Sequence, residues 1–262
     1  MSVLSDTYKP LVSIITASYN SERTIKDTLT SVAMQDYFPI EHIIIDGRSA
    51  DRTIDIVKNF SHIKKIISEK DNGIYDAMNK GIKECSGDII GILNSDDFYP
   101  NPNVISSVVE KMQAENTSAL YGDLIYVSQN NIKKRLRTWI AGEFKASKFL
   151  YGWMPPHPTF FVRREMYDRW GLFNTSLRSA ADYELMLRFL YKHQISVSYL
   201  HQIIVKMRAG GVSNSSIANR IRANKEDSEA WRLNGLKPRF YTSWLKPLRK
   251  VSQFIHDKKE NE

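Results

Sequence analysis

The sequence predicts an α/β fold with a mostly parallel, doubly wound sheet, and three observations lead to this prediction. In the first half, short β-branched apolar runs alternate with segments of helical periodicity, which is the pattern of successive strand–helix–strand units. The 262 residues include 42% hydrophobic and 25% charged residues, a balance typical of a globular domain with a full core. Beyond residue 120 the alternation stops, and the pattern favours antiparallel strands and further helices.

The first half contains four predicted strands and three predicted helices. Residues 11–18 (LVSIITAS) form a β-branched run that is too short for a typical helix, so they predict a buried strand. Ile25, Leu29 and Val32 then recur at spacings of three and four, which predicts an amphipathic helix ending near residue 35. The same alternation continues with strands at 42–47, 63–70 and 88–97 and helices at 51–60 and 74–85.

The second half is predicted to be less regular. Two apolar runs at 118–128 and 133–141 flank Gln129–Asn131 and predict an antiparallel hairpin. The remaining predicted elements are a proline-rich loop, a strand and a short helix within 152–171, a helix at 180–193, a strand at 198–208 that places His201 in the core, and a basic, aromatic helical region from residue 214.

Charge is distributed unevenly along the chain, which has a formal net charge of +8. Residues 1–130 carry 12 basic and 18 acidic side chains, a net charge of −6, whereas residues 131–262 carry 25 basic and 11 acidic side chains, a net charge of +14. The acidic half suits a cation or a metal–nucleotide complex. The basic half suits an anionic surface, either phospholipid or nucleic acid.

Several classes of protein are excluded by what the sequence lacks. A single cysteine, Cys85, rules out an internal disulfide and any multi-cysteine metal site. The 12 glycines form no dinucleotide fingerprint after the first strand, and there is no P-loop lysine motif. No basic, apolar leader opens the chain and no apolar run approaches the roughly 18 residues of a spanning helix. We therefore expect a cytoplasmic protein without a membrane span.

Polar side chains follow three of the predicted strands, where ligands of doubly wound sheets bind. Tyr19 and Asn20 follow the first strand, Asp46 follows the second, and the fourth runs into Asn94-Ser95-Asp96-Asp97. Two adjacent carboxylates repel each other, and a hard cation such as Mg²⁺ or Mn²⁺ compensates them well. The alternative is an Asp-Asp turn that caps the next element. The residues alone leave both interpretations open.

Six segments, taken in order, resemble the inverting glycosyltransferase family 2. They are LVSIITASYNSERTIKDTLTSV, IIIDGRSADRTIDIV, SEKDNGIYDAMNKGI, GDIIGILNSDDFYPNPNVI, HPTFFVRREMYDRWGLFN and AADYELMLRF. The resemblance implies a GT-A fold over residues 1–215, with a nucleotide-sugar half at about 10–100 and an acceptor half at 101–215. Residues 216–262 then form a basic, aromatic C-terminal segment. It is especially similar to enzymes of bacterial exopolysaccharide synthesis, the colanic-acid type among them.

The resemblance assigns the donor-binding residues of the first two loops. Matching the family's nucleotide-binding loop are Thr16, Ala17, Tyr19, Asn20 and Glu22. Asp46 matches the acceptor of the uracil N–H, but the usual Asp-Asp-Gly-Ser pattern is here Asp46-Gly47-Arg48-Ser49. Alignment on Ser49 puts Gly47 at the common base-binding aspartate. Either Asp46 reaches the base from one residue earlier, or the base is not uracil; without the resemblance, Asp46 is a strand-end turn residue.

The resemblance also assigns residues to the ribose, the donor sugar and the metal. Near the ribose and donor sugar it places Asp71, Gly73, Asp76, Asn79, Asn94, Ser95 and Asp96. Asp76 and Asn79 lie three apart on one helical face, so a solvated face is the alternative for this pair. Asn94 replaces the first aspartate of the family motif. Asp97 is the implied ligand of Mn²⁺ or Mg²⁺.

Two residues of the second half are candidates for the acceptor side. Asp182, in Ala181-Asp182, matches an acidic position of the family's acceptor-side helix and is the implied general base, since inverting transfer needs a carboxylate to deprotonate the acceptor. Its alternative is a helix N-cap near Ser179, and Glu184 is a weaker candidate base. His157 lies among three prolines where the family binds the acceptor; a structural role is its alternative.

The C-terminal segment predicts contact with an anionic membrane surface. Between Trp231 and His256 it has six basic residues, no acidic residue and five interleaved aromatic residues, a composition that suits a helix lying on a bilayer. Packing against the domain is the alternative. The expected partners are thus a UDP-sugar or, second, a GDP-sugar, a lipid-linked saccharide acceptor and the inner face of the bacterial cytoplasmic membrane.

Two other functions remain as alternatives. A metal-dependent nucleotidyltransferase would also use Asp96 and Asp97, with Arg23 as the one basic residue in the first loop to hold a triphosphate. Nucleic-acid binding through the basic half is the non-enzymatic alternative. It leaves the strand-end carboxylates unexplained, because they repel phosphate. We therefore expect no nucleic-acid partner.

Overall fold

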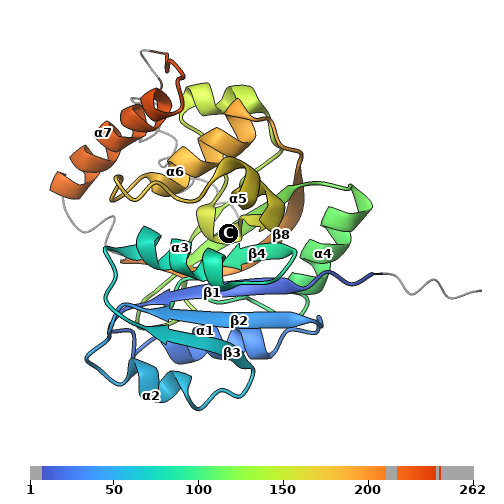
Figure 1. Cartoon of the computed structure of the whole chain (residues 1–262), viewed down its shortest axis with the longest axis vertical. Coiled ribbons are helices and arrows are strands. Elements are labelled where there is room, and N and C mark those ends of the chain that lie inside the picture. The colour runs from blue at the N-terminus through green and yellow to red at the C-terminus, as the bar shows by residue number, and fades with distance from the viewer. Residues whose placement is uncertain (1–7, 211–216, 240–241, 243–262) are drawn as a thin grey trace, which may run out of the picture.

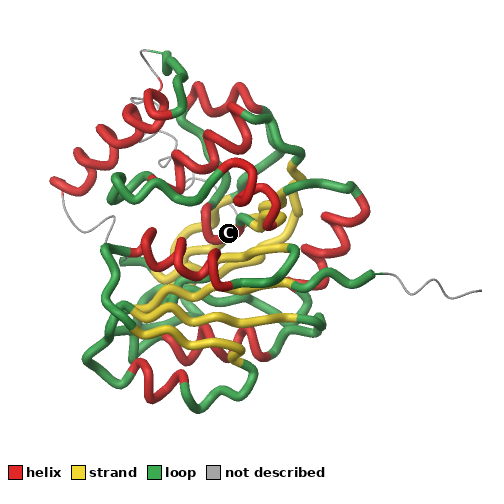
Figure 2. The backbone as a smooth tube through the Cα atoms, viewed as in Figure 1, coloured by secondary structure: helices red, strands yellow, loops and turns green. Residues whose placement is uncertain are grey.

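The computed structural model describes residues 8–210, 217–239 and 242. Its centre is an eight-stranded sheet in which seven strands follow the order β3-β2-β1-β4-β7-β5-β6 and β8 pairs with β5. Figures 1 and 2 show helices on both sides of this sheet, with a second group of helices stacked beyond α3. The α/β prediction is confirmed.

Four parallel strands form one half of the sheet, as the sequence predicts. They are β1 (Val12–Ser18), β2 (Ile40–Asp46), β3 (Ile63–Ser68) and β4 (Ile89–Ile92). β1 pairs in parallel with β2 and β4, and β2 with β3. The β1 and β2 side chains are almost all buried because helices cover both faces. Their carboxyl ends therefore meet at one edge of the sheet.

The other half is mixed. Its strands are β5 (Ala119–Val127), β6 (Arg135–Trp139), β7 (Phe161–Arg163) and β8 (Val197–Arg208). β5 and β6 form the predicted antiparallel hairpin. β7 runs antiparallel to both β4 and β5, and β8 runs parallel to β5. Consequently β4, β5 and β8 all end at the edge where β1 and β2 end.

Helices cover the two faces of the parallel half. The first face packs against α1 (Ile25–Ala33), α2 (Thr53–Val57) and α4 (Val104–Ala114). The second packs against α3 (Ile74–Glu84), whose buried side chains join those of β1, β2 and β4 in the largest hydrophobic cluster. α1, α2 and α3 confirm predicted helices. α4 follows the Asn101-Pro102-Asn103 turn and was not predicted.

A second layer of helices packs beyond α3 (Figure 1). It contains η1 (Ala146–Tyr151), η2 (His157–Thr159), α5 (Arg164–Trp170), α6 (Ala181–Met186), the π-helical η3 (Leu187–Lys192) and α7 (Ile217–Leu233). Tyr183 and Phe189 are fully buried within it and join the same cluster as α3. This packing fixes α6 relative to α3 and to the parallel half of the sheet.

The structure corrects two sequence predictions about exposure. His201 was expected in the core, but its side chain is 67% exposed and its Nε2 lies within hydrogen-bond distance of Glu143 Oε1, at 2.8 Å. The register of β5 and β8 shifts nearby, at Gly122 and Asp123, and such bulges re-aim side chains. Trp231 was expected to face a membrane. It is instead 1% exposed and donates its indole N–H to Tyr183 Oη at 2.9 Å.

The packing alternative therefore holds for the start of the C-terminal segment. Of the other aromatic residues assigned to the membrane, Phe240, Tyr241, Trp244 and Phe254 lie outside the described residues. Within the described ranges, no helix is both long enough and apolar enough to cross a bilayer.

Candidate active site

Asp46, at the end of β2, is fully buried among hydrogen-bond donors. Its carboxylate accepts from Ser18 Oγ at 3.1 Å, from Ser68 Oγ at 2.7 Å and from both the hydroxyl and the N–H of Ser49. Four protein donors thus surround this carboxylate and hold the loop after β2 to β1 and β3. The arrangement favours the strand-end turn role over contact with a nucleobase.

Asp71, which follows β3, lies beside Gly47, the position at which the family resemblance expects the base-binding aspartate. A Cβ added at Gly47 would lie 2.5 Å from Asp71 Oδ2 and 3.3 Å from Tyr19 Cδ2. The absence of a side chain at Gly47 therefore leaves the space that Asp71 fills. Asp71 Oδ1 accepts the Gly73 N–H at 2.9 Å, and the Tyr19 side chain is 64% exposed beside it. A carboxylate and an exposed aromatic ring thus flank Gly47.

The other candidates of the first loop are mostly engaged in shaping it. Asn20 has a positive φ of 48° and accepts the Ala50 N–H at 2.9 Å. Glu22 accepts the Arg52 N–H at 3.1 Å. Ala17 is buried in the core. These contacts tie the loop after β1 to the start of α2, and the exposed Tyr19 side chain takes no part in them.

Thr16 is within hydrogen-bond distance of the first of two paired histidines. Its hydroxyl lies 2.9 Å from His42 Nε2, and His42 Nδ1 lies 3.0 Å from His62 Nε2. Burial, together with the nearby His62, lowers the pKa of His42 to about 3. Burial also lowers the pKa of His62. Thr16 therefore supports the sheet rather than facing the loop.

The histidine pair predicts a loss of stability in mild acid. Because the pKa values are lower in the folded than in the unfolded protein, protons favour unfolding, and stability falls as the pH drops below about 6.5. His42 alone contributes a loss of about 2 kcal/mol between pH 7 and pH 5. Urea unfolding at a series of pH values measures it. His42→Asn should flatten this slope; an unchanged slope in that variant would contradict the assignment.

The Asn94–Asp97 segment leaves buried oxygens without partners. Within the described part of the chain, Asn94 Oδ1 and Asp97 Oδ1 are buried and accept no hydrogen bond. Burial raises the pKa of Asp97 well above its usual range, and the adjacent Asp96 carboxylate raises it further. Burial also raises the pKa of Asp96. Unpartnered buried acceptors of this kind are costly, which indicates that something else completes the site.

A divalent cation fits these oxygens. Carboxylate and amide oxygens are the ligands that Mg²⁺ and Mn²⁺ prefer. Among the described residues, no group of three or more His, Cys, Asp or Glu side chains could hold a metal. Mg²⁺ sites in nucleotide enzymes commonly have only one or two carboxylates, and substrate phosphates and waters provide the other ligands. Asp97, with Asp96 and Asn94 beside it, has this character.

Two contacts fix the segment in place. Ser95 Oγ lies 2.7 Å from Ser21 Oγ, which joins it to the loop after β1. Arg208, the buried last residue of β8, donates to the Asp96 carbonyl at 2.6 Å and forms an ion pair with Asp27 of α1. The guanidinium thus places a positive charge against the paired carboxylates.

The α3 candidates differ in role. Gly73 has a φ of 114° just before the helix, and Asp76 accepts the Asn72 N–H at 3.0 Å, with Lys80 3.7 Å away. Asn79 is buried and exchanges two hydrogen bonds of 2.9 Å with the backbone of Phe173. Both ends of its amide are therefore used in joining α3 to the second layer, which argues against contact with the donor.

Asp182 of α6 faces α3 across the two halves of the domain. Tyr75 Oη donates to Asp182 Oδ1 at 3.1 Å. Burial raises the pKa of Tyr75 well above its usual range, and the Asp182 charge raises it further, so Tyr75 remains a donor. The N-cap alternative for Asp182 is not seen, because Ala180 is the N-cap residue of α6 and no side chain caps this helix. Glu226 of α7 accepts the N–H groups of Ser179 and Ala180.

His157 and Glu184 are the other candidates of the second half. The His157 ring meets Phe173 edge-on at 5.7 Å. Burial lowers the pKa of His157, while the Asp182 charge acts in the opposite direction. Glu184 is buried and accepts from Arg188 and from Asn234. Since its oxygens are engaged, Asp182 is the better candidate base.

Sequence reasoning missed three residues of the site: Ser21, Tyr75 and Arg208. Tyr75 lies within a quoted segment, in the first turn of a predicted helix, and its distance in sequence from Asp182 concealed the contact. Arg208 is the final residue of the last predicted strand. The strand-end rule that selected the acidic residues could have selected it too.

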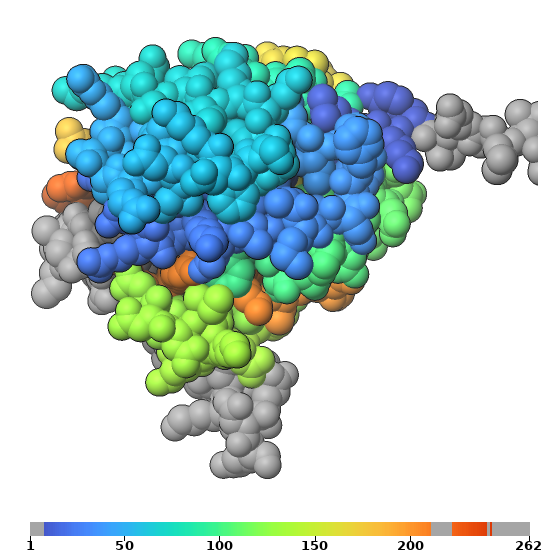
Figure 3. All heavy atoms as spheres, turned by 90° about the horizontal axis from the view of Figure 1, so that it is seen from below, coloured from blue at the N-terminus to red at the C-terminus, as the bar shows by residue number. Residues whose placement is uncertain are grey.

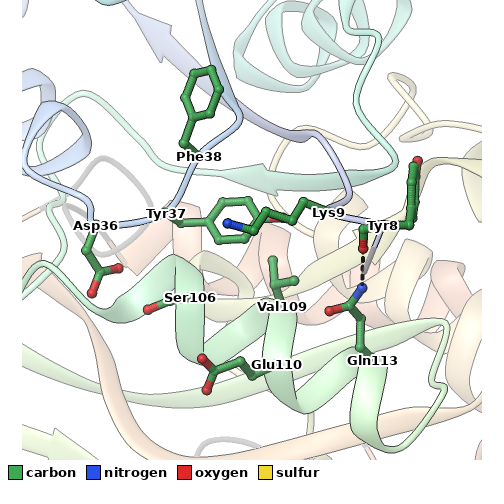
Figure 4. Close-up of a pocket in the computed structure, with 9 residues that line it drawn as sticks. All are labelled: Tyr8, Lys9, Asp36, Tyr37, Phe38, Ser106, Val109, Glu110 and Gln113. Carbon is green, nitrogen blue, oxygen red and sulfur yellow. Dashed lines mark hydrogen bonds between the residues drawn. The ribbon is translucent and has the colours of Figure 1, made fainter. Parts of the chain in front are cut away.

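A hollow of about 430 Å³ lies at the opposite, amino edge of the sheet. Figure 4 shows it between the segment before β1, the loop before β2 and α4. It is lined by Tyr8, Lys9, Asp36, Tyr37, Phe38, Ser106, Val109, Glu110 and Gln113. None of the sequence-predicted site residues belongs to it. The candidate active site is thus the carboxyl edge, where β1, β2 and β4 end.

The chain is similar to known proteins over most of its length. The family described as Glycosyl transferase family 2 matches residues 13–172. An uncharacterized glycosyltransferase of Mycobacterium tuberculosis is 34% identical over 189 residues, covering 70% of this chain and 70% of that protein. The PGL/p-HBAD biosynthesis glycosyltransferase of the same species is 28% identical over 214 residues, covering 79% of this chain and 81% of that protein.

Solved structures share the fold at low identity. S. aureus TarS 1–349 in complex with UDP-GlcNAc has a TM-score of 0.65 and 19% identity, covering 85% of this chain and 65% of that one. The mannosyltransferase PcManGT from Pyrobaculum calidifontis, in complex with GDP-Man and Mn²⁺, has a TM-score of 0.64 and 17% identity, covering 95% of this chain and 71% of that one. With the family match over more than half of its residues, the chain belongs to glycosyltransferase family 2 and is a glycosyltransferase of the GT-A fold.

Proposed function

We propose that the protein is a metal-dependent, inverting glycosyltransferase that moves a sugar from a nucleotide-diphosphate donor to a lipid-linked saccharide. The placement of its carboxylates carries this proposal. Asp96 and Asp97 lie at the end of β4 with a buried oxygen that has no partner among the described residues, whereas Asp182 lies on the acceptor-side helix and is held by Tyr75 of α3. The two groups can thus serve the leaving group and the acceptor separately.

The chemistry is a single displacement. An acceptor hydroxyl oxygen bonds to the anomeric carbon while the bond from that carbon to the nucleotide diphosphate breaks, and Asp182 takes the hydroxyl proton. A Mg²⁺ or Mn²⁺ ion at Asp97 would stabilise negative charge on the departing diphosphate. Arg208 helps to keep the Asp96–Asp97 turn in shape for that ion, because it binds the Asp96 carbonyl.

The donor is a nucleotide sugar with uracil as the favoured base. The TarS and PcManGT structures contain UDP-GlcNAc and GDP-Man, which supports a nucleotide-sugar donor. Asp71 has one oxygen engaged by Gly73 and the other beside Gly47. A single carboxylate oxygen matches the one imide N–H of uracil, while guanine offers two neighbouring donors. Tyr19 is exposed next to it, where its ring can stack on the base.

The acceptor and its location follow from charge. Residues 131–262 have a net charge of +14, which supports binding to an anionic lipid surface. We therefore place the enzyme on the inner face of the bacterial cytoplasmic membrane, where a lipid-linked saccharide of a surface polysaccharide would be presented. The alternative nucleotidyltransferase receives less support, because the chain matches the family described as Glycosyl transferase family 2 over residues 13–172.

The assignment of the base can be tested by calorimetric titration with UDP. Asp71→Asn keeps an oxygen for the Gly73 N–H but presents an amide to the base, so UDP affinity should fall about tenfold or more. Asp55→Asn makes the same substitution on an exposed residue of α2 and should leave the affinity unchanged. If UDP binds the Asp71→Asn variant as tightly as it binds the original protein, Asp71 is not the base-binding residue.

A further inference from the structure

The β5–β6 hairpin carries a surface that the proposed chemistry does not use. Its tip and second strand, residues 130–140, are basic and apolar, and residues 124–142 contain no acidic side chain. Lys133 and Lys134 are exposed. Three aliphatic side chains are exposed among them: Ile132 by 36%, Leu136 by 41% and Ile140 by 55%. Figure 3 shows the yellow-green segment around these residues as a lobe projecting from the body of the molecule.

Packing does not explain this composition. β6 is the last strand in the order of the sheet, and edge strands commonly carry lysines that prevent pairing with another chain. Lysines alone would serve that purpose. Here exposed aliphatic side chains lie beside them, and clustered exposed apolar surface marks contact with another apolar phase. Cations beside aliphatic groups match the headgroups and the upper acyl region of an anionic bilayer.

The hairpin tip lies at the same edge of the sheet as the candidate active site. β5 runs parallel to β8 and in the direction of β4, so its carboxyl end, where the hairpin turns, is beside the ends of β4 and β8. The contacts agree with this geometry. Phe98, directly after Asp97, pairs with Lys206 of β8, and the Ala209 N–H is donated to the Val127 carbonyl at 2.9 Å.

From these observations we propose that the tip of the β5–β6 hairpin docks the protein on an anionic lipid surface. Lys133 and Lys134 attract the headgroups, and Ile132, Leu136 and Ile140 enter the interface. Because the hairpin ends at the active-site edge, docking turns that edge toward the bilayer. The proposal builds on the proposed function, since a lipid-linked acceptor would then meet the site from the membrane. It also assigns membrane contact to the domain itself rather than to the C-terminal segment alone.

The test is co-sedimentation of the full-length protein with vesicles of phosphatidylcholine, with or without phosphatidylglycerol. Lys133→Ala/Lys134→Ala should weaken binding to the anionic vesicles about tenfold at low salt. The matched control is Lys58→Ala/Lys64→Ala, which removes two exposed lysines at the amino edge of the sheet. The two double variants have equal net charge. The control should bind as the original protein does.

Leu136→Gln tests the apolar part, because it keeps every charge. It should weaken binding severalfold at both low and high salt, whereas the lysine effect should shrink as salt rises. Equal losses in the hairpin and control lysine variants, or no loss in either, would overturn the proposal. So would an unchanged affinity of Leu136→Gln.

Two other occupants are distinguishable in the same samples. Binding to duplex DNA that is as tight as binding to anionic vesicles, and equally sensitive to the hairpin lysines, would mean that the surface binds nucleic acid. A dimer that dissociates on Leu136→Gln in sedimentation velocity would mean that it binds a second copy. Calorimetric UDP binding by the variants separates this proposal from the proposed function, since hairpin variants should keep full donor affinity even where vesicle binding is lost.

Discussion

Replacing Asp182 with asparagine is expected to lower kcat about 10²-fold or more and to leave donor affinity unchanged. Asparagine has almost the same shape but cannot take the proton of the acceptor hydroxyl. The side chain lies on α6 and is reached by Tyr75 at 3.1 Å, on the acceptor side of the proposed site. Measuring kcat by release of the nucleotide diphosphate, and donor affinity by calorimetry, separates the two effects.

The control for this variant is Asp168→Asn. It makes the same substitution at an exposed position of α5 in the same layer, and its kcat should equal that of the original protein. If Asp182→Asn loses donor affinity while kcat is retained, Asp182 is not the base, and Glu184 becomes the residue to test. Glu184→Gln is expected to lower the free energy of unfolding as well, because Glu184 accepts hydrogen bonds from both Arg188 and Asn234.

The second large effect is expected for Asp97→Ala. Removing the implied metal ligand should weaken nucleotide-sugar binding in the presence of Mn²⁺ by roughly 10²-fold or more, with a matching loss of turnover. The fold should remain, because Asp97 Oδ1 has no hydrogen-bond partner among the described residues and removing the carboxylate relieves repulsion with Asp96. Thermal unfolding of the metal-free proteins checks the fold, and calorimetry checks binding.

Two comparisons make this result interpretable. Asp36→Ala removes an exposed carboxylate at the opposite edge of the sheet and should change neither binding nor turnover. Chelation of metal by EDTA should reproduce the Asp97→Ala defect in the original protein. Equal activity in EDTA and in Mn²⁺ would contradict metal dependence.

The parallel half of the fold was predictable from sequence because its signals are local. β1 and β2 are buried on both faces, so both are rich in β-branched residues. The Asp96–Asp97 pair was noticeable for the same reason, since the repulsion between adjacent carboxylates after an apolar strand needs compensation whatever structure surrounds them. The resemblance to family 2 then placed Asp182, which no local pattern distinguishes from a helix cap.

The roles that sequence could not settle depend on contacts between distant residues. Asp46 and Asp71 both follow strands, and only the position of Ser18, Ser49 and Ser68 around Asp46 separates them. Asn79 has the composition of a ligand-binding residue but is engaged by the Phe173 backbone.

Exposure was hard to predict for a similar reason. Trp231 has the surroundings of a membrane anchor in sequence, yet it is buried in the core, where it donates to Tyr183 and packs against the Tyr191 ring. His201 lies in a strand whose register shifts against β5, so the alternation of buried and exposed side chains is broken there. Both outcomes depend on a neighbouring element rather than on the local sequence.

One measurement tests the central claim, which is inverting sugar transfer from a nucleotide diphosphate at the carboxyl edge of the sheet. The protein is incubated with Mn²⁺, an α-linked UDP-sugar and a saccharide acceptor, and the products are followed by ³¹P and ¹H NMR. The account predicts UDP together with a new β-linkage. A new α-linkage would contradict inversion, and release of pyrophosphate from a nucleoside triphosphate and a sugar phosphate would identify a nucleotidyltransferase instead.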